Sequence, residues 1–421
     1  MFKVTEVKIN NFWYRADAYC TFNKDVNIII GKNGTGKTTF MNILHSALNV
    51  DLDALIENDF DQIEIKLNHN NKQKTIKVKK ESNKNSQFAF IDYFISNKKY
   101  SLRTIITNDI RIGLHYKKRA MEVSSELRKI ISSFVSLASL SVYRLRGGDE
   151  IEVFDKKEKK LISPVDFRLS QLTSELTQYQ LELGLEARNI SISLQKDVLA
   201  SILYTDSELE LYIPNDFERA KETHSLVTAY KRLNAMDRTI KNKITKHVDA
   251  IDMAVEQLRT SKNRKSQTKI DFAALEAFVR TRKIIEMSLA AEEKTNKVFS
   301  QIELFISILK EFIPDKKFHL DAGGLTATNL NNEEIELKKL SSGEKQLLIL
   351  LIETLLQRSS PFIFLTDEPE ISLHIEWQRK IIPAVRQLNP EAQVIAATHS
   401  PEVASKYRSY IKDMKGVVNV R

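Results

Sequence analysis

Four runs among the first eighty residues predict β-strands: residues 1–10, 17–30, 61–67 and 73–79. The last two runs alternate between apolar and polar positions. A period of two places every second side chain on the same face, which is typical of a half-buried sheet. The last two runs are separated by residues 68–71, Asn-His-Asn-Asn, which predict the turn of a hairpin.

The pattern changes between Pro164 and about Pro314, where apolar residues recur three and four positions apart and glycine almost disappears. This period predicts helices. A polar stretch at residues 260–267 (TSKNRKSQ) predicts a tip or turn, so we expect two or three long helices. Short strands are then expected at residues 317–321, 325–329 and 334–338.

These patterns predict an α/β fold interrupted by a long helical insertion. The head is expected to form from two separated parts, residues 1–163 and 315–421, and the insertion from residues 164–314. Residues 362–366 (FIFLT) form an apolar run without polar alternation, which is typical of a parallel strand buried on both faces. We therefore expect a mixed sheet and a parallel core in the head, with a coiled-coil-like arm.

A glycine-rich segment, Gly31 to Thr38 (GKNGTGKT), lies between a predicted strand and a predicted helix. In this context the pattern G-x-x-x-x-G-K-[ST] forms a phosphate-binding loop, in which Lys37 reaches the β and γ phosphates and Thr38 ligates Mg²⁺. A chance glycine turn is the alternative, but such a match is expected only ~0.01–0.02 times in a chain of this size. The residues expected to bind ATP here are Gly31, Asn33, Gly34, Gly36, Lys37, Thr38 and Thr39.

Two adjacent acids follow the predicted parallel strand. Asp367 stands where a carboxylate holds Mg²⁺, usually through water, and Glu368 is the candidate base for the water that attacks the γ-phosphate. A solvated acidic turn would contain the same residues. A second apolar run, residues 393–397, ends next to His399, which is placed to contact the γ-phosphate or the water. We therefore predict Glu368 and His399 as catalytic residues, with Thr38 and Asp367 as metal ligands.

The segment LSSGEKQ, residues 340–346, leads into a long apolar helix predicted for residues 344–358. Ser341 and Glu344 have the spacing of a capping box, so a purely structural role is one interpretation. In the other, Ser341 and the N–H of Gly343 present a helix N-terminus to phosphate. One chain cannot enclose ATP from both sides with its phosphate loop and this helix, so the second interpretation predicts two chains around two nucleotides.

As a set, these motifs resemble those of prokaryotic ABC-type ATPases of the SMC, RecF and OLD branch, and in particular the ATPase subunits of the Septu and PARIS anti-phage systems (PtuA and AriA). The matching elements are the strand before Asn10-Asn11-Phe12, the loop at 31–38, LSSGEKQ, the DEPE strand end, Leu373-His374 and THSP at 398–401. They cover the two ends of the chain and leave the middle unmatched. The resemblance implies ATP and Mg²⁺ as cofactors.

The resemblance also assigns roles outside the phosphate loop. It implies that Ser372, Leu373 and His374 form a loop crossing the dimer seam, and that His399 is the switch histidine. The signature reads Ser-Ser-Gly-Glu where transporters have Ser-Gly-Gly-Gln, which argues against a transporter. No glutamine can be assigned to the lobe-linking loop; Tyr143-Arg144 is similar to the pair found there in the family and is expected to couple the lobes.

Composition limits the remaining possibilities. The chain has 421 residues, of which 42% are hydrophobic and 28% charged, as in ordinary globular proteins. No apolar run approaches the ~18–20 residues that span a bilayer, and the N-terminus lacks a secretory core, so no membrane contact and a cytoplasmic location are expected. Cys20 is the only cysteine, which excludes an internal disulfide and a zinc cluster of cysteines.

Charge is concentrated within the predicted insertion. The chain carries a formal charge of +9, and residues 217–283 hold 16 Lys and Arg against 8 Asp and Glu. Such a cluster attracts phosphate backbones without reading sequence. A solvated lysine-rich helix surface or contact with a partner protein would give the same composition. Because aromatic residues are sparse in the segment, stacking on single-stranded bases has little support.

Three functions fit these observations to different degrees. The first is an ATPase that pairs head to head and acts as sensor or scaffold for a separate nuclease or toxin in anti-phage defence. The second is a DNA repair or recombination ATPase similar to RecF, which the basic segment favours. The third, a transporter motor, conflicts with the signature and with the insertion. By analogy with defence ATPases, a larger assembly such as a hexamer is expected.

Overall fold

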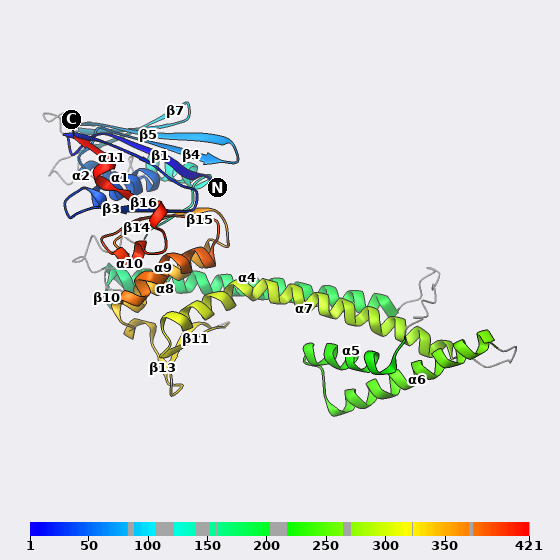
Figure 1. Cartoon of the computed structure of the whole chain (residues 1–421). Helices are drawn as coiled ribbons and strands as arrows, with labels where there is room; N and C mark the ends of the chain where they lie inside the picture. Colours follow the sequence, from blue (N-terminus) through cyan, green and yellow to red (C-terminus); the bar gives the residue numbers. More distant parts are fainter. Residues whose placement is uncertain are drawn as a thin grey trace. The chain divides into compact units, whose positions relative to one another are not determined.

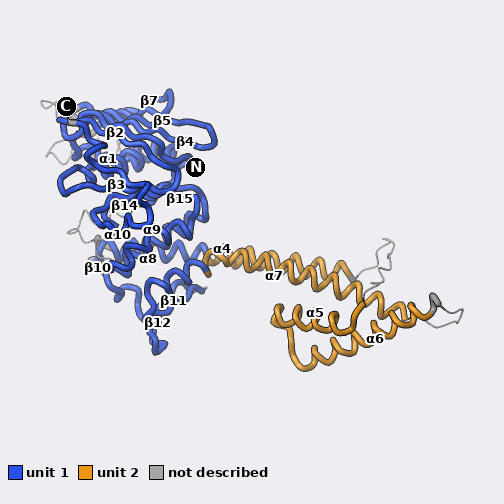
Figure 2. Tube along the Cα trace, in the orientation of Figure 1, with its two compact units in different colours: residues 1–179, 304–421 blue, residues 180–303 orange. Residues whose placement is uncertain are grey.

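The computed structural model describes residues 1–82, 88–105, 122–139, 151–155, 158–202, 217–263, 271–321, 323–369 and 374–420. The chain divides into two compact units (Figure 2). Unit 1 combines residues 1–179 with residues 304–421, and unit 2 comprises residues 180–303. Among the described helices, none combines the length and the apolar character needed to cross a membrane.

Unit 1 contains a seven-stranded antiparallel sheet in the order β17-β2-β1-β4-β5-β6-β7 (Figure 1). Its strands are β1 (Lys3–Phe12), β2 (Ala16–Thr21), β4 (Gln62–His69), β5 (Lys72–Ser82), β6 (Phe88–Ile95), β7 (Lys98–Ile105) and β17 (Val418–Val420). The predicted hairpin is present, because β4 pairs with β5 across Asn70 and Asn71, which both adopt positive φ. Asparagine tolerates this conformation better than most residues, which explains its use in the turn.

A second sheet has five strands in the order β16-β3-β15-β14-β8, and all of its strand pairs are parallel. Its strands are β3 (Val26–Ile30), β8 (Leu137–Ser139), β14 (Phe362–Asp367), β15 (Ala392–Ala397) and β16 (Ile411–Asp413). Every residue of β15 is buried, as expected of a strand covered on both faces. The prediction that residues 17–30 form one strand is wrong: the chain leaves β2 after Thr21 and enters the other sheet at Val26.

Helix α1 (Lys37–Asn49) lies between the two sheets (Figure 1). Phe40, Ile43 and Leu44 are fully buried in a core that also includes residues of β1, β4, β14 and β15. The short helix α2 (Leu52–Glu57) follows it, with the side chain of Asp51 accepting from the N–H of Ala54. Packing on two sheets fixes α1, and with it the loop that precedes it.

The remaining elements of unit 1 surround the parallel sheet or form a smaller lobe. Helix α8 (Ser342–Leu356) packs against α9 (Ile375–Leu388), which also contacts β15. The smaller elements are β9 (Ile151–Asp155), β10 (Glu158–Ile162), β11 (Lys316–Asp321), β12 (Gly324–Asn329), β13 (Glu334–Ile335), η2 (Leu337–Lys339), α10 (Pro401–Ala404), η3 (Arg408–Tyr410) and α11 (Met414–Val417). Strands β11, β12 and β13 form one antiparallel sheet, which agrees with the three strands expected there.

The predicted insertion is helical throughout its described part. It contains α4 (Pro164–Ile202), α5 (Arg219–Arg232), α6 (Arg238–Asn263) and α7 (Phe272–Phe312), so it has one helix more than expected. Helices α4 and α7 each extend from unit 1 into unit 2 along the chain. In unit 2 a separate core of α5, α6 and α7 includes Val248, Ile251 and Phe278. The α/β class with a long helical insertion is therefore confirmed.

Candidate nucleotide site

Three strand ends meet at one edge of the parallel sheet. Strand β15 lies between β3 and β14, with Ala397 in register with both Ile29 and Asp367. Because parallel strands present their carboxyl ends together, the segments that follow all three emerge side by side. These segments are the glycine loop after β3, His399 after β15 and Glu368 after β14.

The glycine loop has the geometry of a phosphate cradle. Gly34 and Gly36 adopt φ of 77° and 95°, which L-residues with side chains avoid. A Cβ at Gly36 would also lie 2.8 Å from the Trp13 ring and 2.9 Å from Phe12. The loop is thus pressed against the turn between β1 and β2, and the N-terminus of α1 follows it directly. Oriented N–H groups at a helix N-terminus suit an anion.

Lys37 is held inward at the start of α1 and is only 4% exposed. Its Nζ donates to the carbonyl oxygens of Gly31 at 2.9 Å and Lys32 at 3.3 Å. It also lies 2.6 Å from Nε2 of His399. A lysine ammonium has donors and no acceptor, so the ring nitrogen accepts this hydrogen bond.

Glu368 is positioned by its backbone. Its N–H donates to the carbonyl oxygen of Ala397 at 2.7 Å, and its φ is 49°, in the left-handed region. Such a conformation costs on the order of 1–3 kcal/mol for a residue other than glycine, and is found at functional sites. The Oε1 atom lies 3.4 Å from Nε2 of His399.

The donor set fits Mg²⁺ with a nucleotide. Thr38 is exposed at the first turn of α1, and Asp367 ends β14 beside Glu368. Mg²⁺ takes hard oxygen ligands, and it is commonly held by one or two protein oxygens together with phosphates and water. No group of three or more His, Cys, Asp or Glu capable of holding a metal occurs among the described residues. A metal held jointly with phosphates is consistent with this arrangement.

The predicted signature segment lies at the N-terminus of α8. Both halves of the capping box are present: the Oγ of Ser341 accepts from the N–H of Glu344 at 3.3 Å, and Glu344 accepts from the N–H of Ser341 at 2.8 Å. Lys316 of β11 also donates to Glu344 at 2.7 Å. Ser341 and Ser342 are exposed, whereas Gly343 is buried.

The side chains of the signature segment bond close to their own helix: Glu344 pairs with Lys316, and Lys345 pairs with Asp166 at 2.8 Å. The structure therefore brings together the glycine loop, the acidic pair and His399, and leaves the signature segment apart from them. Within its own chain Ser341 is the N-cap of α8, and its Oγ accepts one hydrogen bond. Its hydroxyl is exposed, and the O–H group can still donate a hydrogen bond to another molecule.

Other predicted residues fall into two groups. Asn33 is exposed in the glycine loop and Thr39 is half-buried in α1, while His374 is exposed and caps α9. Ser372, Leu373 and the pair Tyr143-Arg144 lie outside the described residues.

Sequence reasoning missed two features of the site. The first is the ring of Trp13, which lies against Gly36. The guanidinium of Arg15 lies over this ring, 5.0 Å from the ring centroid. A cavity of about 690 Å³ opens beside the loop, lined by residues that include Lys32, Ser400 and Arg408. The aromatic residues around the end of the strand at residues 3–12 were a signal in the sequence for the Trp13 contact. The cavity could not be predicted in this way, because it forms only when the C-terminal segment returns to pair with β3.

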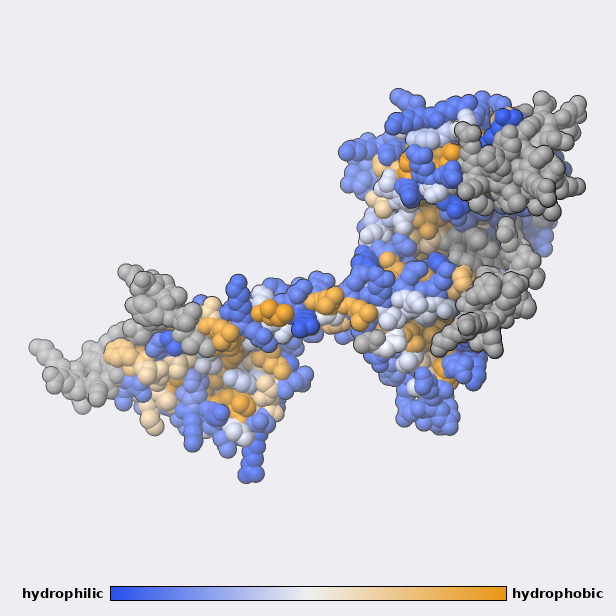
Figure 3. Space-filling model, turned by 180° about the vertical axis from the view of Figure 1, so that it is seen from behind, coloured by the Kyte–Doolittle hydropathy of each residue, from blue (hydrophilic) through white to orange (hydrophobic). Residues whose placement is uncertain are grey.

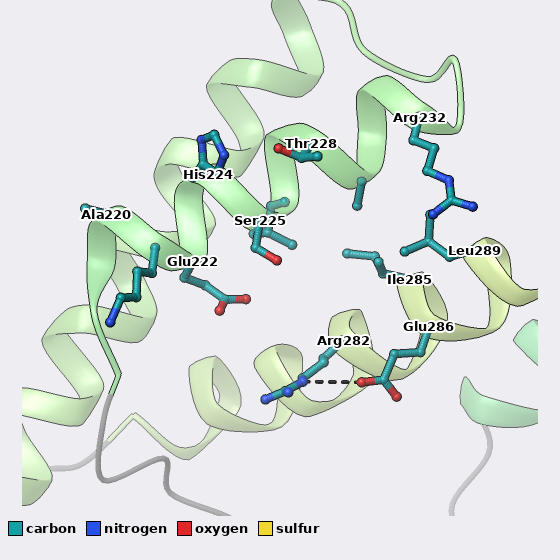
Figure 4. A pocket seen from close by; sticks show the side chains of 13 residues that line it. Ala220, Glu222, His224, Ser225, Thr228, Arg232, Arg282, Ile285, Glu286 and Leu289 are labelled. Atoms are coloured by element: carbon teal, nitrogen blue, oxygen red, sulfur yellow. Dashed lines mark hydrogen bonds and ion pairs between the residues drawn. The ribbon is translucent and has the colours of Figure 1, made fainter.

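A hollow of about 780 Å³ in unit 2 is a poorer candidate (Figure 4). It lies between α5 and α7, and none of the predicted site residues lines it. Arg282 and Glu286, on successive turns of α7, form an ion pair at 3.4 Å on its wall. Its lining contains no convergent acid and base with a nucleophile, so we assign no chemistry to it.

The basic segment is more local than the window 217–283 indicated. Unit 2 as a whole holds 20 Lys and Arg against 19 Asp and Glu, so the arm is close to neutral. Several cations of α5 and α7 are paired, as in Arg219–Asp249 and Arg232–Glu292. Residues 238–248 of α6 contain four exposed Lys and Arg and no acid. Among the described residues of the segment, the first three turns of α6 are therefore a stretch of positive charge without acids.

The chain is similar to known proteins that are named as probable ATPases or belong to an anti-phage system. The chain is 23% identical to the Retron Vc95 probable ATPase of Vibrio cholerae serotype O1 biovar El Tor, over 93% of this chain and 69% of that protein. It is 38% identical to the Retron Ec83 probable ATPase of Escherichia coli over 84 residues, 17% of this chain and 16% of that protein. It is 31% identical to the Septu protein PtuA of Bacillus thuringiensis over 86 residues, 17% of this chain and 22% of that protein.

Among solved structures, the Smc head domain with an extended coiled coil from Pyrococcus furiosus matches 100% of this chain and 96% of its own, with 12% identity and a TM-score of 0.45. The family described as AAA ATPase domain matches residues 2–404. That match covers both ends of the head and the insertion between them. The chain belongs to the AAA ATPase domain family.

Proposed function

We propose that the chain binds ATP with Mg²⁺, hydrolyses it between two copies of itself, and uses this cycle to control a separate nuclease or toxin in anti-phage defence. The convergence of Lys37, His399 and Glu368 at one edge of the parallel sheet carries the catalytic part, with Nε2 of His399 at 2.6 Å from Lys37 and 3.4 Å from Glu368. A lysine, a histidine and a carboxylate so close together form a constellation for phosphoryl transfer to water.

Each residue has a distinct role in this proposal. Lys37, now bonded to two loop carbonyls, binds the β and γ phosphates, and the loop N–H groups hold the phosphate chain. Thr38 and Asp367 hold Mg²⁺, which neutralises charge on the phosphate oxygens. The carboxylate of Glu368 accepts a proton from the attacking water. When phosphate binds Lys37, His399 is released from that lysine. Its Nε2 atom then forms a hydrogen bond with the γ-phosphate.

The second copy is needed because the signature segment does not reach the site of its own chain. Ser341 and Ser342 are exposed at the N-terminus of α8, a 15-residue helix whose dipole favours an anion. A second head would bring this helix to the γ-phosphate. ATP then stabilises the pair of heads, and its hydrolysis separates them.

Control of an effector is supported by the relatives. The Retron Vc95 probable ATPase aligns with 93% of this chain, and a segment of PtuA from the Septu system aligns as well. The resemblance to Septu and PARIS ATPases implies a separate effector protein. Conversion of ATP-driven head pairing into capture or release of that protein is the simplest use of such a cycle.

The catalytic part is tested by ATP turnover of Glu368→Gln, with Glu376→Gln as matched control at an exposed position of α9. Loss of a general base lowers kcat by roughly 100- to 10,000-fold. We expect this loss for Glu368→Gln together with retained binding of labelled ATP, and unchanged turnover for the control. Turnover of Glu368→Gln equal to that of the wild type would remove Glu368 from its role.

One observation supports the alternative of a RecF-like, DNA-binding ATPase: residues 238–248 at the start of α6 contain no acidic residue. Lys241, Lys243 and Lys246 are exposed there. If the chain binds duplex DNA through this surface, replacing the three lysines by glutamine weakens binding and lowers the salt dependence by about 0.9 per lost phosphate contact. Unchanged binding and salt slope would exclude α6 as the DNA surface.

A further inference from the structure

The backbone around His399 is fixed on both sides of the histidine by hydrogen bonds. Before it, the N–H of Thr398 donates to the carbonyl oxygen of Ile29 in β3 at 3.0 Å. After it, the N–H of Ser400 donates to Oγ1 of Thr398 at 2.9 Å. Thr398 is fully buried, so these two bonds hold the backbone of His399 against the end of the parallel sheet.

The side chain of Ser400 links this segment to helix α9. Its Oγ donates to Oε1 of Gln378 at 2.8 Å, and the same oxygen accepts from the N–H of Glu402 at 3.2 Å as the N-cap of α10. The acceptor on Gln378 fixes the direction of the hydroxyl proton, which leaves a lone pair of the oxygen for the N–H of Glu402. Gln378 therefore helps to set the conformation of the residue that follows His399.

A second contact between the same elements is the weaker of the two. Arg379, the neighbour of Gln378, forms an ion pair with Glu402. The Arg379 side chain is 58% exposed, and exposed ion pairs contribute only about 0–1 kcal/mol. The bond between Gln378 and Ser400 is partly buried and ends one residue from His399. We therefore expect this bond, and not the ion pair, to matter for the site.

Helix α9 gives Gln378 a fixed support. The apolar side of the helix is buried in unit 1 through Ile381, Ile382, Ala384, Val385 and Leu388. In the view of Figure 3, hydrophilic side chains cover much of unit 1, as expected when such apolar side chains lie inside. Near the start of α9, the Trp377 ring meets the Phe312 ring of α7 edge-on, with 6.0 Å between their centroids. A residue that positions another must itself be held by packing.

The same helix also follows the turn that contains Glu368. Along the chain, α9 begins at Ile375, shortly after that residue. Its contact with the His399 segment runs through Gln378 and Ser400. A single helix thus adjoins both segments whose side chains meet in the site, where Oε1 of Glu368 lies 3.4 Å from Nε2 of His399.

We propose that Gln378 is a positioning residue for His399. Through Ser400 it keeps the imidazole within reach of the γ-phosphate and of the water beside Glu368. This inference rests on the proposed function, in which His399 bonds to the γ-phosphate. Gln378 itself touches neither nucleotide nor water and acts only through the serine. A displacement of a reacting group by about 1 Å lowers a rate by up to about 100-fold, so a single bond at this distance is enough to matter.

The first experiment measures ATP turnover of Gln378→Leu, which keeps a side chain of similar length and removes the acceptor. We expect kcat to fall roughly 10- to 100-fold and KM to change less than about threefold, because the glycine loop and Lys37 hold the phosphate chain. Gln387→Leu is the matched control, since Gln387 is exposed on the same helix and should keep the wild-type rate. A wild-type kcat in Gln378→Leu would overturn the proposal.

Two further variants guard against a loss of folding in Gln378→Leu. Gln378→Glu keeps an oxygen acceptor for the Ser400 hydroxyl and should retain most of the turnover. Ser400→Ala breaks the same bond from the other side and should lower kcat as Gln378→Leu does. Combining Ser400→Ala with Gln378→Leu should lower kcat no further, because both remove one interaction. Additive losses, or a Gln378→Glu chain as slow as Gln378→Leu, would contradict the positioning role.

The sharpest test repeats the substitution in a chain without the histidine. His399→Ala should lower kcat, and adding Gln378→Leu should leave the residual rate unchanged, because a positioning residue has no effect once the group that it positions is absent. A purely structural role of Gln378 would lower the residual rate again in the double variant, and that result would overturn the proposal.

These variants also separate the positioning role of Gln378 from the proposed role of His399. Low turnover in His399→Ala together with full turnover in Gln378→Leu would exclude the positioning role alone. Full turnover in His399→Ala would exclude the catalytic role of the histidine, and the positioning role with it.

Discussion

At the scale of single residues, two glycines with opposite surroundings test the geometry of the site. Gly36 has φ of 95° and no room for a Cβ, whereas Gly184 lies within α4 with nothing within 4 Å of a built Cβ. Gly36→Ala should lower stability by about 1–3 kcal/mol and impair nucleotide binding, because the loop must shift. Gly184→Ala should raise stability by ~0.5–1 kcal/mol, because alanine favours the helix.

Thermal unfolding and titration with labelled ATP check both glycine variants. Equal tolerance of alanine at Gly36 and at Gly184 would contradict the cradle geometry, since only the first position needs a residue without Cβ.

The convergence of the candidate residues could be predicted from the sequence, because each motif lies at the end of a recognisable strand; their roles stay predictions. Gly31, Lys37 and His399 are brought to one edge as expected. The bond from Lys37 to His399 could not be predicted, since it depends on the order of strands that are far apart in the chain. The positive φ of Glu368 depends likewise on the carbonyl of Ala397 in a neighbouring strand.

At the scale of elements, a buried ion pair joins α4 to α8. Arg168 donates twice to Oε1 of Glu353, at 3.0 and 2.7 Å, and Glu353 is 4% exposed. Breaking a buried pair leaves an uncompensated charge, so Arg168→Leu should cost about 3 kcal/mol at neutral pH. Lys339→Ala, which removes an exposed pair with Glu336, is the control and should change stability little.

The loss of stability in Arg168→Leu should depend on pH, in a direction set by the pKa of Glu353. Burial raises the pKa of the Glu353 carboxyl above its ordinary value of 4.5, and the Arg168 guanidinium lowers it in part. A raised carboxyl pKa means that stability is fully present below about pH 4.5 and is lost as pH rises through the folded pKa. Urea unfolding should therefore show the deficit of Arg168→Leu growing from pH 5 to pH 8. A deficit that shrinks over this range would contradict the burial of a charged Glu353.

Element types were better predicted than their number and partners. The parallel strand 362–366, the hairpin across 68–71 and the helix after LSSGEKQ all follow from local patterns. The break between β2 and β3 was missed, because both strands are apolar and only the long-range pairing of β3 separates them.

At the scale of the whole molecule, ATP should drive pairing of heads. Sedimentation of Glu368→Gln with ATP should show a heavier species than without it, because ATP persists between the heads when hydrolysis is blocked. Adding Ser341→Arg to this variant should remove the ATP-dependent species, since a bulky side chain at the exposed N-cap of α8 blocks the second surface. An undiminished ATP-dependent species in the combined variant would place the head contact elsewhere.

The most direct test of the central claim is complementation between two inactive chains. Lys37→Ala removes the phosphate lysine, and Ser341→Arg blocks the signature surface. If ATP is enclosed by Lys37 of one copy and Ser341 of another, a pair made of one chain of each kind contains one intact site of two. The account predicts ATP turnover near zero for each variant alone and, for the mixture, a turnover of up to about half the wild-type rate. A mixture as inactive as its components, or a Ser341→Arg chain with full activity, would contradict it.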